Sequence, residues 1–187
     1  LGVQLEPETV RYYPEGKLLS QVLGFVGYKD NATEKQGLYG LEKFFQTDLA
    51  GIPGSVSQEK DASGAWIFGG KRELKPAKDG VNLILTIDRS IQAKTESLLE
   101  EAVEKHSADG GCIMVMNPKT GAILAMASFP NYNPNEYAKV TDPAVFNNFC
   151  TTGSYEPGSV FKAFTMAGSI DQGKITPDTT YTDTGEV

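Results

Sequence analysis

The sequence has very few residues of the kinds that bind metals or complete a histidine-based catalytic triad. Its single histidine is His106, and its two cysteines are Cys112 and Cys150. A Ser-His-Asp triad would have to use His106, which is better explained as an exposed residue at the end of a helix. A zinc site has too few ligands here. Cys112 lies in an apolar run, which favours a buried free thiol, and a disulfide to Cys150 stays open as the alternative.

Long apolar runs and clusters of basic residues are also lacking. No apolar stretch is long enough for a transmembrane helix or a signal peptide. The net charge is -7, and the 17 lysines and arginines are scattered, which argues against nucleic acid as a partner. The sequence begins at Leu1 rather than at a methionine, so we expect that upstream residues were removed.

The sequence does contain enough apolar residues for an ordinary core, since 40% of its 187 residues are hydrophobic. Residues 1–78 are rich in glycine, proline and turn signals. Within them, 18–28 predicts a loop or short strand whose glycines allow close backbone approach. Residues 40–50 predict a helix, 61–64 a turn and 65–70 a hairpin or turn.

The pattern changes after this region, where longer periodic segments begin. The expected elements are a strand over 81–87, a helix capped by Asp88 and running to about Lys105, antiparallel strands over 112–116 and 122–127, a short helix over 142–149 and a helix over 159–172. The last helix is apolar around most of its circumference, so we expect it to be buried and to desolvate Lys162. Because a buried helix needs other layers around it, the sequence looks cut through a domain.

The segment from Tyr155 to Lys162 carries the strongest chemical signal. Pro157-Gly158 predicts a turn, and Ser159 falls where the helix would begin. Lys162 is three residues later, so the two side chains share a face of the helix. A serine hydroxyl becomes a nucleophile when a neighbouring base takes its proton, and a lysine of lowered pKa can be that base. The simpler alternative is a serine that only caps its helix.

Six ordered elements together resemble the class B penicillin-binding proteins, the D,D-transpeptidases that cross-link peptidoglycan. The elements are Arg11-Tyr12-Tyr13-Pro14-Glu15-Gly16, Gly24-Phe25-Val26-Gly27, Gly40-Leu41-Glu42, Leu85-Thr86-Ile87-Asp88 with Gln92, Asn117-Pro118-Lys119-Thr120-Gly121 followed by Ala125-Met126-Ala127, and the segment from Tyr155 to Lys162. The resemblance implies an α+β fold in two parts. Residues 1–78 would form a β-rich amino-terminal pedestal of the dimerisation type, and 79–187 the incomplete start of a transpeptidase domain with an antiparallel sheet and helices.

The same resemblance implies roles for individual residues. Ser159 would be the acylated nucleophile, Lys162 its base, and the backbone N–H of Ser159 one donor of the oxyanion hole. Arg11 and Glu42 would hold the pedestal together. Ser159 would attack stem peptides ending in D-Ala-D-Ala and pass the acyl group to an amine of a neighbouring strand, and β-lactams would acylate the same serine. No cofactor is implied.

The sequence departs from the family pattern after Lys162. The family's Ser-x-Asn and Lys-Thr-Gly motifs do not follow it, and Lys119-Thr120-Gly121 lies before the serine in an expected turn. The amino-terminal membrane anchor, which would place the protein on the outer side of a bacterial cell membrane, is missing too. We therefore expect an inactive fragment of a transpeptidase. The alternatives are a β-lactam sensor or β-lactamase, and a non-catalytic module that contacts a membrane-embedded glycosyltransferase.

Overall fold

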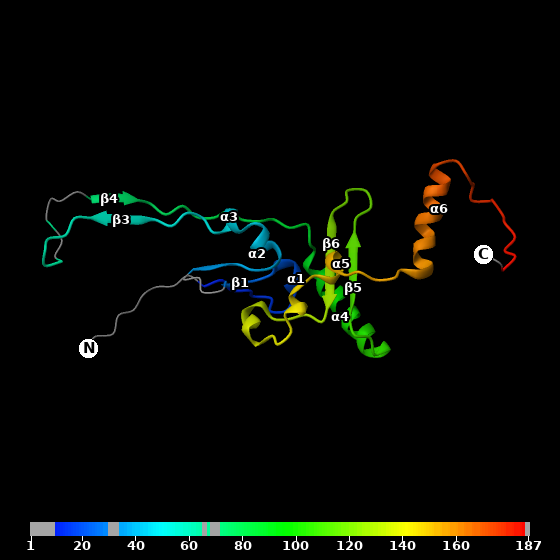
Figure 1. Cartoon of the computed structure of the whole chain (residues 1–187), viewed down its shortest axis with the longest axis horizontal. Helices are drawn as coiled ribbons and strands as arrows, with labels where there is room; N and C mark the ends of the chain where they lie inside the picture. Colours follow the sequence, from blue (N-terminus) through cyan, green and yellow to red (C-terminus); the bar gives the residue numbers. More distant parts are fainter. Residues whose placement is uncertain (1–9, 30–33, 65–66, 68–71, 186–187) are drawn as a thin grey trace. The chain divides into compact units, whose positions relative to one another are not determined.

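The computed structural model describes residues 10–29, 34–64, 67 and 72–185, which form helices and three two-stranded antiparallel sheets (Figure 1). The expected α+β class is thus confirmed. The chain divides into two compact units, Leu1–Gly153 and Ser154–Val187. No helix among the described residues is long and apolar enough to cross a membrane.

The first unit begins with short elements around glycines that allow close packing. They are the helix α1 (Ser20–Leu23), the paired strands β1 (Val26–Tyr28) and β2 (Lys35–Gly37), and the helices α2 (Gly40–Phe44) and α3 (Gln46–Leu49). Gly24 has a φ of 74°, and a Cβ there would overlap the backbone carbonyl of Tyr39. The predicted close approach at the glycines is confirmed. The single helix expected over 40–50 is broken in two at Phe45.

A β-hairpin follows that the sequence did not reveal. It consists of β3 (Ser55–Gln58) and β4 (Arg72–Lys75). The turn expected over 61–64 is present, since the N–H of Gly64 donates to the carbonyl of Asp61. The hairpin or turn expected over 65–70 lies outside the described residues, apart from Ile67.

The prediction of a strand over 81–87 is wrong. The segment is not part of any sheet in the described structure. Its hydrogen bonds go instead to single groups, such as the Thr86 hydroxyl donating to the carbonyl of Ile123. Alternation of apolar residues gives a strand only where a neighbouring strand is available to pair with.

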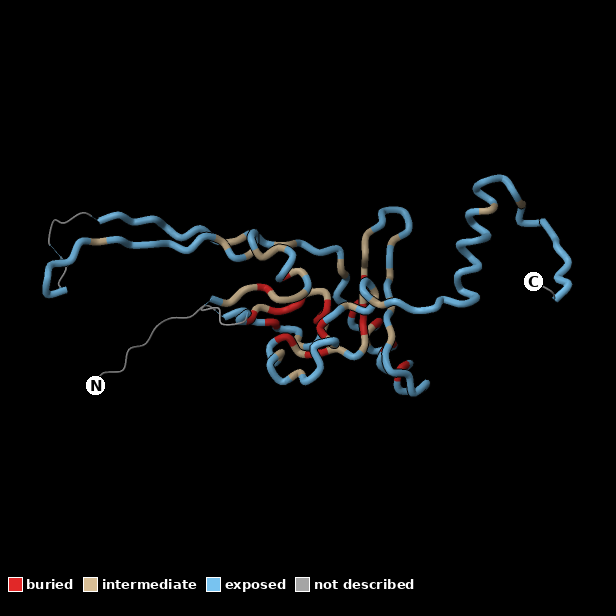
Figure 2. Tube along the Cα trace, in the orientation of Figure 1, coloured by how far each residue is buried: buried red, intermediate tan, exposed pale blue. Residues whose placement is uncertain are grey.

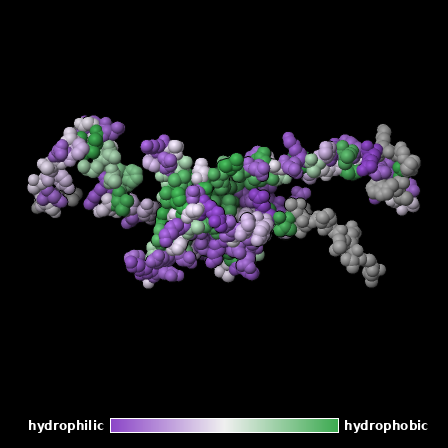
Figure 3. All heavy atoms as spheres, turned by 180° about the vertical axis from the view of Figure 1, so that it is seen from behind, coloured by the Kyte–Doolittle hydropathy of each residue, from purple (hydrophilic) through white to green (hydrophobic). Residues whose placement is uncertain are grey.

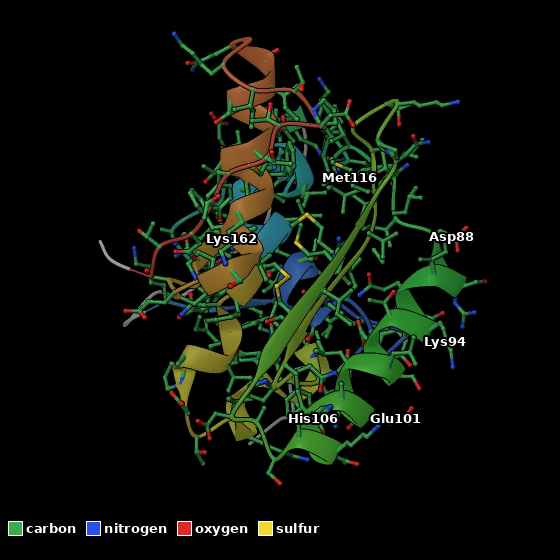
Figure 4. All side chains as sticks on the ribbon, turned by 90° about the vertical axis from the view of Figure 1, so that its right-hand side faces the viewer. Asp88, Lys94, Glu101, His106, Met116 and Lys162 are labelled. Carbon is green, nitrogen blue, oxygen red and sulfur yellow. A yellow bond between two sulfur atoms is a disulfide. The ribbon has the colours of Figure 1, made fainter. Side chains whose placement is uncertain are left out.

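The helix α4 (Arg89–His106) and the hairpin beside it match the sequence predictions. The Asp88 carboxylate accepts hydrogen bonds from the N–H groups of Ser90 and Ile91, which fixes the start of the helix. The strands β5 (Gly111–Met116) and β6 (Ile123–Phe129) pair in antiparallel fashion. Figure 4 shows α4 running beside this hairpin, from Asp88 at its start to His106 at its exposed end.

After β6 the first unit closes with short helical turns. They are the 3₁₀ helices η1 (Pro134–Lys139) and η2 (Pro143–Phe146) and the helix α5 (Phe149–Thr152), where the sequence predicted one short helix. A disulfide joins Cys150 of α5 to Cys112 of β5. The preferred expectation of a buried free thiol is therefore wrong. Cys112 is exposed, and α5 brings the Cα of Cys150 to 5.5 Å from that of Cys112, a normal spacing for a disulfide.

The core of the first unit joins residues from both sides of position 78. Four buried aromatic side chains form one cluster, contributed by Tyr13, Phe25, Tyr132 and Phe146. The Phe25 ring is in edge contact with Phe146 at a centroid distance of 4.7 Å. A second, smaller cluster seats α4 on β6 through Leu99, Val103 and Ala127. Figure 2 shows the buried residues (red) gathered in this unit.

The second unit has little secondary structure. A 3₁₀ turn, η3 (Gly158–Phe161), leads directly into the helix α6 (Lys162–Asp171), and the remaining described residues are extended or turn. The helix falls where the sequence predicted it, but its predicted burial is wrong. The exposed fractions of Phe161, Phe164 and Met166 are 56%, 70% and 48%. Figure 3 shows apolar surface (green) along α6, and no residue of this helix is buried.

Candidate active site

The turn before α6 places Ser159 and Lys162 on the same side of the chain. Gly158 has a φ of 57°, a conformation that favours glycine, and the chain then enters η3. A 3₁₀ helix has three residues per turn, so the side chains of residues i and i+3 are eclipsed. The N–H of Lys162 donates to the carbonyl of Ser159, which closes this turn. This backbone geometry agrees with the predicted shared face, and Lys162 is the first residue of α6 (Figure 4).

Both side chains are exposed. Within the described part of the chain, neither the Ser159 hydroxyl nor the Lys162 ammonium forms a hydrogen bond or ion pair. The backbone N–H of Ser159 belongs to the first turn of η3, whose N–H groups have no carbonyl partner within the helix. It is thus free to donate to a ligand. The arrangement has a hydroxyl, an amine three residues later and one backbone donor, without the desolvation expected from a buried helix.

The pair formed by Arg11 and Glu42 stands where the sequence predicted a structural role. The guanidinium Nε donates to the buried Glu42 carboxylate at 2.6 Å. The Tyr13 hydroxyl donates to the same oxygen at 3.3 Å and accepts from the N–H of Val26. Burial, and then the charge of Glu42, raises the pKa of Tyr13 above its ordinary value. The hydroxyl therefore keeps its proton and ties three segments of the first unit together.

A cavity that could hold a ligand lies elsewhere. It has a volume of about 580 Å³ and is lined by residues of the first unit, including Asp109, Phe129, Asp142 and Phe149. Neither Ser159 nor Lys162 lines it. No group of three or more His, Cys, Asp or Glu side chains in the described ranges could hold a metal ion.

The sequence analysis missed the structural importance of two amide side chains. Gln92 is fully buried and hydrogen-bonds both backbone groups of Met126. Asn135 does the same for Tyr13, at 2.9 Å from its N–H and 2.8 Å from its carbonyl. A signal existed for Gln92, because it shares the apolar face of its helix with Thr95 and Leu99 at positions i, i+3 and i+7. A polar residue on such a face needs buried partners.

Comparison with protein families matches both halves of the chain. Residues 1–85 match the family described as the penicillin-binding protein dimerisation domain, and residues 111–187 match the penicillin-binding protein transpeptidase domain. The chain belongs to the class B penicillin-binding proteins. The resemblance stated from its six sequence elements is thereby confirmed.

Individual relatives agree with this assignment. Stage V sporulation protein D of Bacillus subtilis is 40% identical over 93% of this penicillin-binding protein chain, and the match covers 26% of that protein. Peptidoglycan D,D-transpeptidase FtsI of Escherichia coli is 33% identical over 93% of the chain and 28% of its own length. The chain thus spans little more than a quarter of these relatives.

Two solved structures share the fold. A peptidoglycan synthetase from Bifidobacterium adolescentis aligns with a TM-score of 0.74 at 28% identity, over 94% of this chain and 31% of that one. Penicillin-binding protein 2X from Streptococcus thermophilus aligns with a TM-score of 0.66 at 28% identity, over 90% and 25% of the two chains.

Proposed function

We propose that the protein represented by this chain is a serine D,D-transpeptidase that cross-links peptidoglycan stem peptides. The observation that carries the proposal is the backbone turn that joins Ser159 to Lys162 at the start of α6, in a chain that matches the transpeptidase family over 111–187. Ser159 is the nucleophile, and Lys162 takes its proton. The N–H of Ser159 is one donor to the developing oxyanion.

The reaction proceeds in two acyl transfers. Ser159 Oγ forms an ester with the carbonyl carbon of the penultimate D-Ala, and the bond to the terminal D-Ala breaks. That D-Ala leaves as an amine after receiving a proton. An amine of a neighbouring stem peptide then attacks the ester and regenerates the Ser159 hydroxyl. A β-lactam would acylate the same oxygen through opening of its ring amide.

We propose further that residues 1–187 alone do not turn over substrate. The family's Ser-x-Asn and Lys-Thr-Gly motifs, which would supply the second oxyanion donor and a cation for the substrate carboxylate, do not follow Lys162 in this sequence. Removing one oxyanion donor costs about 100- to 1000-fold in rate.

The remaining expectations from the sequence also belong to the proposal. Residues 1–78 would be the pedestal and 79–187 the start of the transpeptidase domain. The whole protein would act on the outer side of a bacterial cell membrane, and its pedestal would contact a membrane-embedded glycosyltransferase that makes the glycan strands. The exposed side chains of the β3–β4 hairpin leave room for such a contact.

The test is the intact mass after incubation with a penicillin. We expect no adduct on residues 1–187, and one covalent adduct on a chain extended at its carboxyl end to the length of the relatives. Ser159→Ala should abolish that adduct, and Ser154→Ala, an exposed serine of the same segment, should keep it. If the extended chain stayed unlabelled, the transpeptidase proposal would be wrong. An adduct on residues 1–187 would show that the missing motifs are not needed for acylation.

A further inference from the structure

The buried side chain of Gln92 replaces a neighbouring strand at one point of β6. Its Oε1 accepts from the N–H of Met126 at 2.8 Å, and its Nε2 donates to the Met126 carbonyl at 3.0 Å. β6 pairs with β5 on its other edge, so these two backbone groups face away from the hairpin. Gln92 thereby fixes α4 to one residue of β6, and no buried polar side-chain atom in the described structure lacks a partner.

Glu96 extends this contact to the amino-terminal part of the chain. Its Oε1 accepts from Gln92 Nε2 at 2.7 Å and from the backbone N–H of Leu19 at 2.7 Å. Leu19 directly precedes α1 and has a φ of 61°, a conformation that is unfavourable for a residue with a Cβ. Such a conformation persists where the surroundings fix it, and Glu96 supplies one such contact. A continuous hydrogen-bonded path therefore runs from Leu19 through Glu96 and Gln92 to Met126.

The same short stretch of β6 also holds α5, which precedes the Ser159 segment in sequence. The N–H of Phe149 donates to the Ser128 hydroxyl at 3.2 Å. The amide of Asn148 lies 3.0 Å from the sulfur of Met126, the residue that Gln92 binds. The disulfide to Cys112 ties Cys150 to the hairpin as well. The residues that bind the pedestal and those that bind α5 thus meet at Met126 and Ser128.

We propose that Gln92 and Glu96 form a latch that fixes the pedestal to β6 and so positions the segment bearing Ser159 for acylation. The inference rests on the proposed transpeptidase function. Both are positioning residues, because they act through Met126 and Leu19 and do not touch the reacting atoms. If the hydrogen bonds of Gln92 and Glu96 break, Met126 of β6 loses its link to α4 and to Leu19. Met126 is also the residue that Asn148, at the start of α5, contacts. The chain leading from α5 to Ser159 would then be held less firmly.

The test uses the full-length protein and a fluorescent penicillin, with binding and acylation measured separately. Gln92→Met keeps the length of the side chain and removes both hydrogen bonds to Met126. We expect it to slow the acylation step by about tenfold, the scale of one to two hydrogen bonds, with the dissociation constant within about twofold. Glu96→Ala should slow the step similarly. Glu96→Gln should restore it to within about twofold, because an amide oxygen still accepts from Leu19.

A matched control and a structural readout decide between outcomes. Glu101→Ala removes an exposed carboxylate from the same helix and should acylate like the wild type. Amide exchange at Leu19 and Met126 should become faster in Gln92→Met and Glu96→Ala. Faster exchange with unchanged acylation in both variants would overturn the positioning role, while the proposed function would stand. If the wild-type protein itself were not acylated, the proposed function would fall, and the latch's role in acylation with it. If Gln92→Met does not fold, the Glu96→Ala and Glu96→Gln pair still decides, because Glu96 is only partly buried.

Discussion

The helices α4 and α6 have similar sequence signals and opposite surroundings. Both carry apolar residues at helical spacing, but α4 buries Gln92, Thr95, Leu99 and Val103, whereas no residue of α6 is buried. Asp88 caps α4 through its side chain, and the residue before α6 provides no such cap. Of the two residues proposed for chemistry, Lys162 begins the less supported of these two helices and Ser159 lies in η3 just before it. The presence of the Ser159-x-x-Lys162 motif therefore does not by itself provide a packed active site.

The largest expected effect is on amide hydrogen exchange. A helix of 10 residues without packing is marginal in water, so the amides from Ala163 to Ile170 should exchange nearly as fast as an unfolded peptide in residues 1–187. The amides of α4 that face β6 should exchange only through large-scale opening, which slows them by about 1000-fold or more. Mass spectrometry of peptides from the two helices measures both. Strong protection of α6 would show that the two helices do not differ in support.

A matched pair of substitutions tests the difference in packing between α4 and α6 through the free energy of unfolding. Leu99 is 6% exposed and packs with Val103 and Ala127, whereas Phe164 is 70% exposed. Leu99→Ala should lower the free energy of unfolding by about 2–5 kcal/mol. Phe164→Ala should change it by less than about 0.5 kcal/mol, because its ring is already in water. Urea unfolding of residues 1–187 measures both changes. Equal losses from the two substitutions would mean that α6 is packed.

The difference between the helices also explains which predictions from sequence succeeded. The start of α4 and the β5–β6 hairpin depend on local signals, namely the Asp88 cap, the apolar spacing and the turn at Asn117–Gly121, and these were predicted. The contact of Phe25 with Tyr132 and Phe146 joins segments that are distant in sequence, so no local pattern revealed it. The Cys112–Cys150 disulfide was left open for the same reason, since it depends on where α5 lies.

The candidate site likewise has features that local sequence determines and features that depend on distant parts of the chain. The spacing of Ser159 and Lys162, together with Pro157-Gly158, was enough to predict a shared face at the start of a helix. The burial of that helix depends on other parts of the protein that would pack against it. The apolar residues around α6 indicate that such packing is needed, but they do not show what provides it. The failed strand over 81–87 has the same cause, because its pairing partner could not be read from its own alternation.

The buried tyrosines of the first unit should make its stability depend on pH in the alkaline range. Burial raises the pKa of Tyr13 and of Tyr132 above the ordinary value of 10.0, with the Glu42 charge adding to the effect at Tyr13. Below pH 10 both phenols are protonated in the folded and unfolded states, so these two groups do not change the stability there. Above it the unfolded state loses these protons first. The free energy of unfolding should therefore fall by about 1 kcal/mol per tyrosine between about pH 10 and pH 11.

Urea titrations at several pH values check this expectation. Tyr132→Phe should flatten the alkaline loss by about half, because one of the two buried phenols can no longer ionise. Tyr155→Phe is the control from the second unit, since Tyr155 is 71% exposed, and it should leave the slope unchanged. If Tyr155→Phe changed the alkaline loss of stability and Tyr132→Phe did not, the pH dependence would come from the second unit and the expectation would be wrong.

The smallest effect is expected at the cap that distinguishes the two helices. The Asp88 carboxylate accepts from the N–H groups of Ser90 and Ile91, both at 2.9 Å. Asp88→Ala leaves these two donors to water and should cost about 1 kcal/mol. Asp88→Asn keeps an acceptor oxygen and should cost much less, which separates the hydrogen bond from the charge of the carboxylate. Urea midpoints of the two variants give the comparison. If both variants lose the same stability, the interaction of the charge with the helix dipole, and not the cap itself, secures the start of α4.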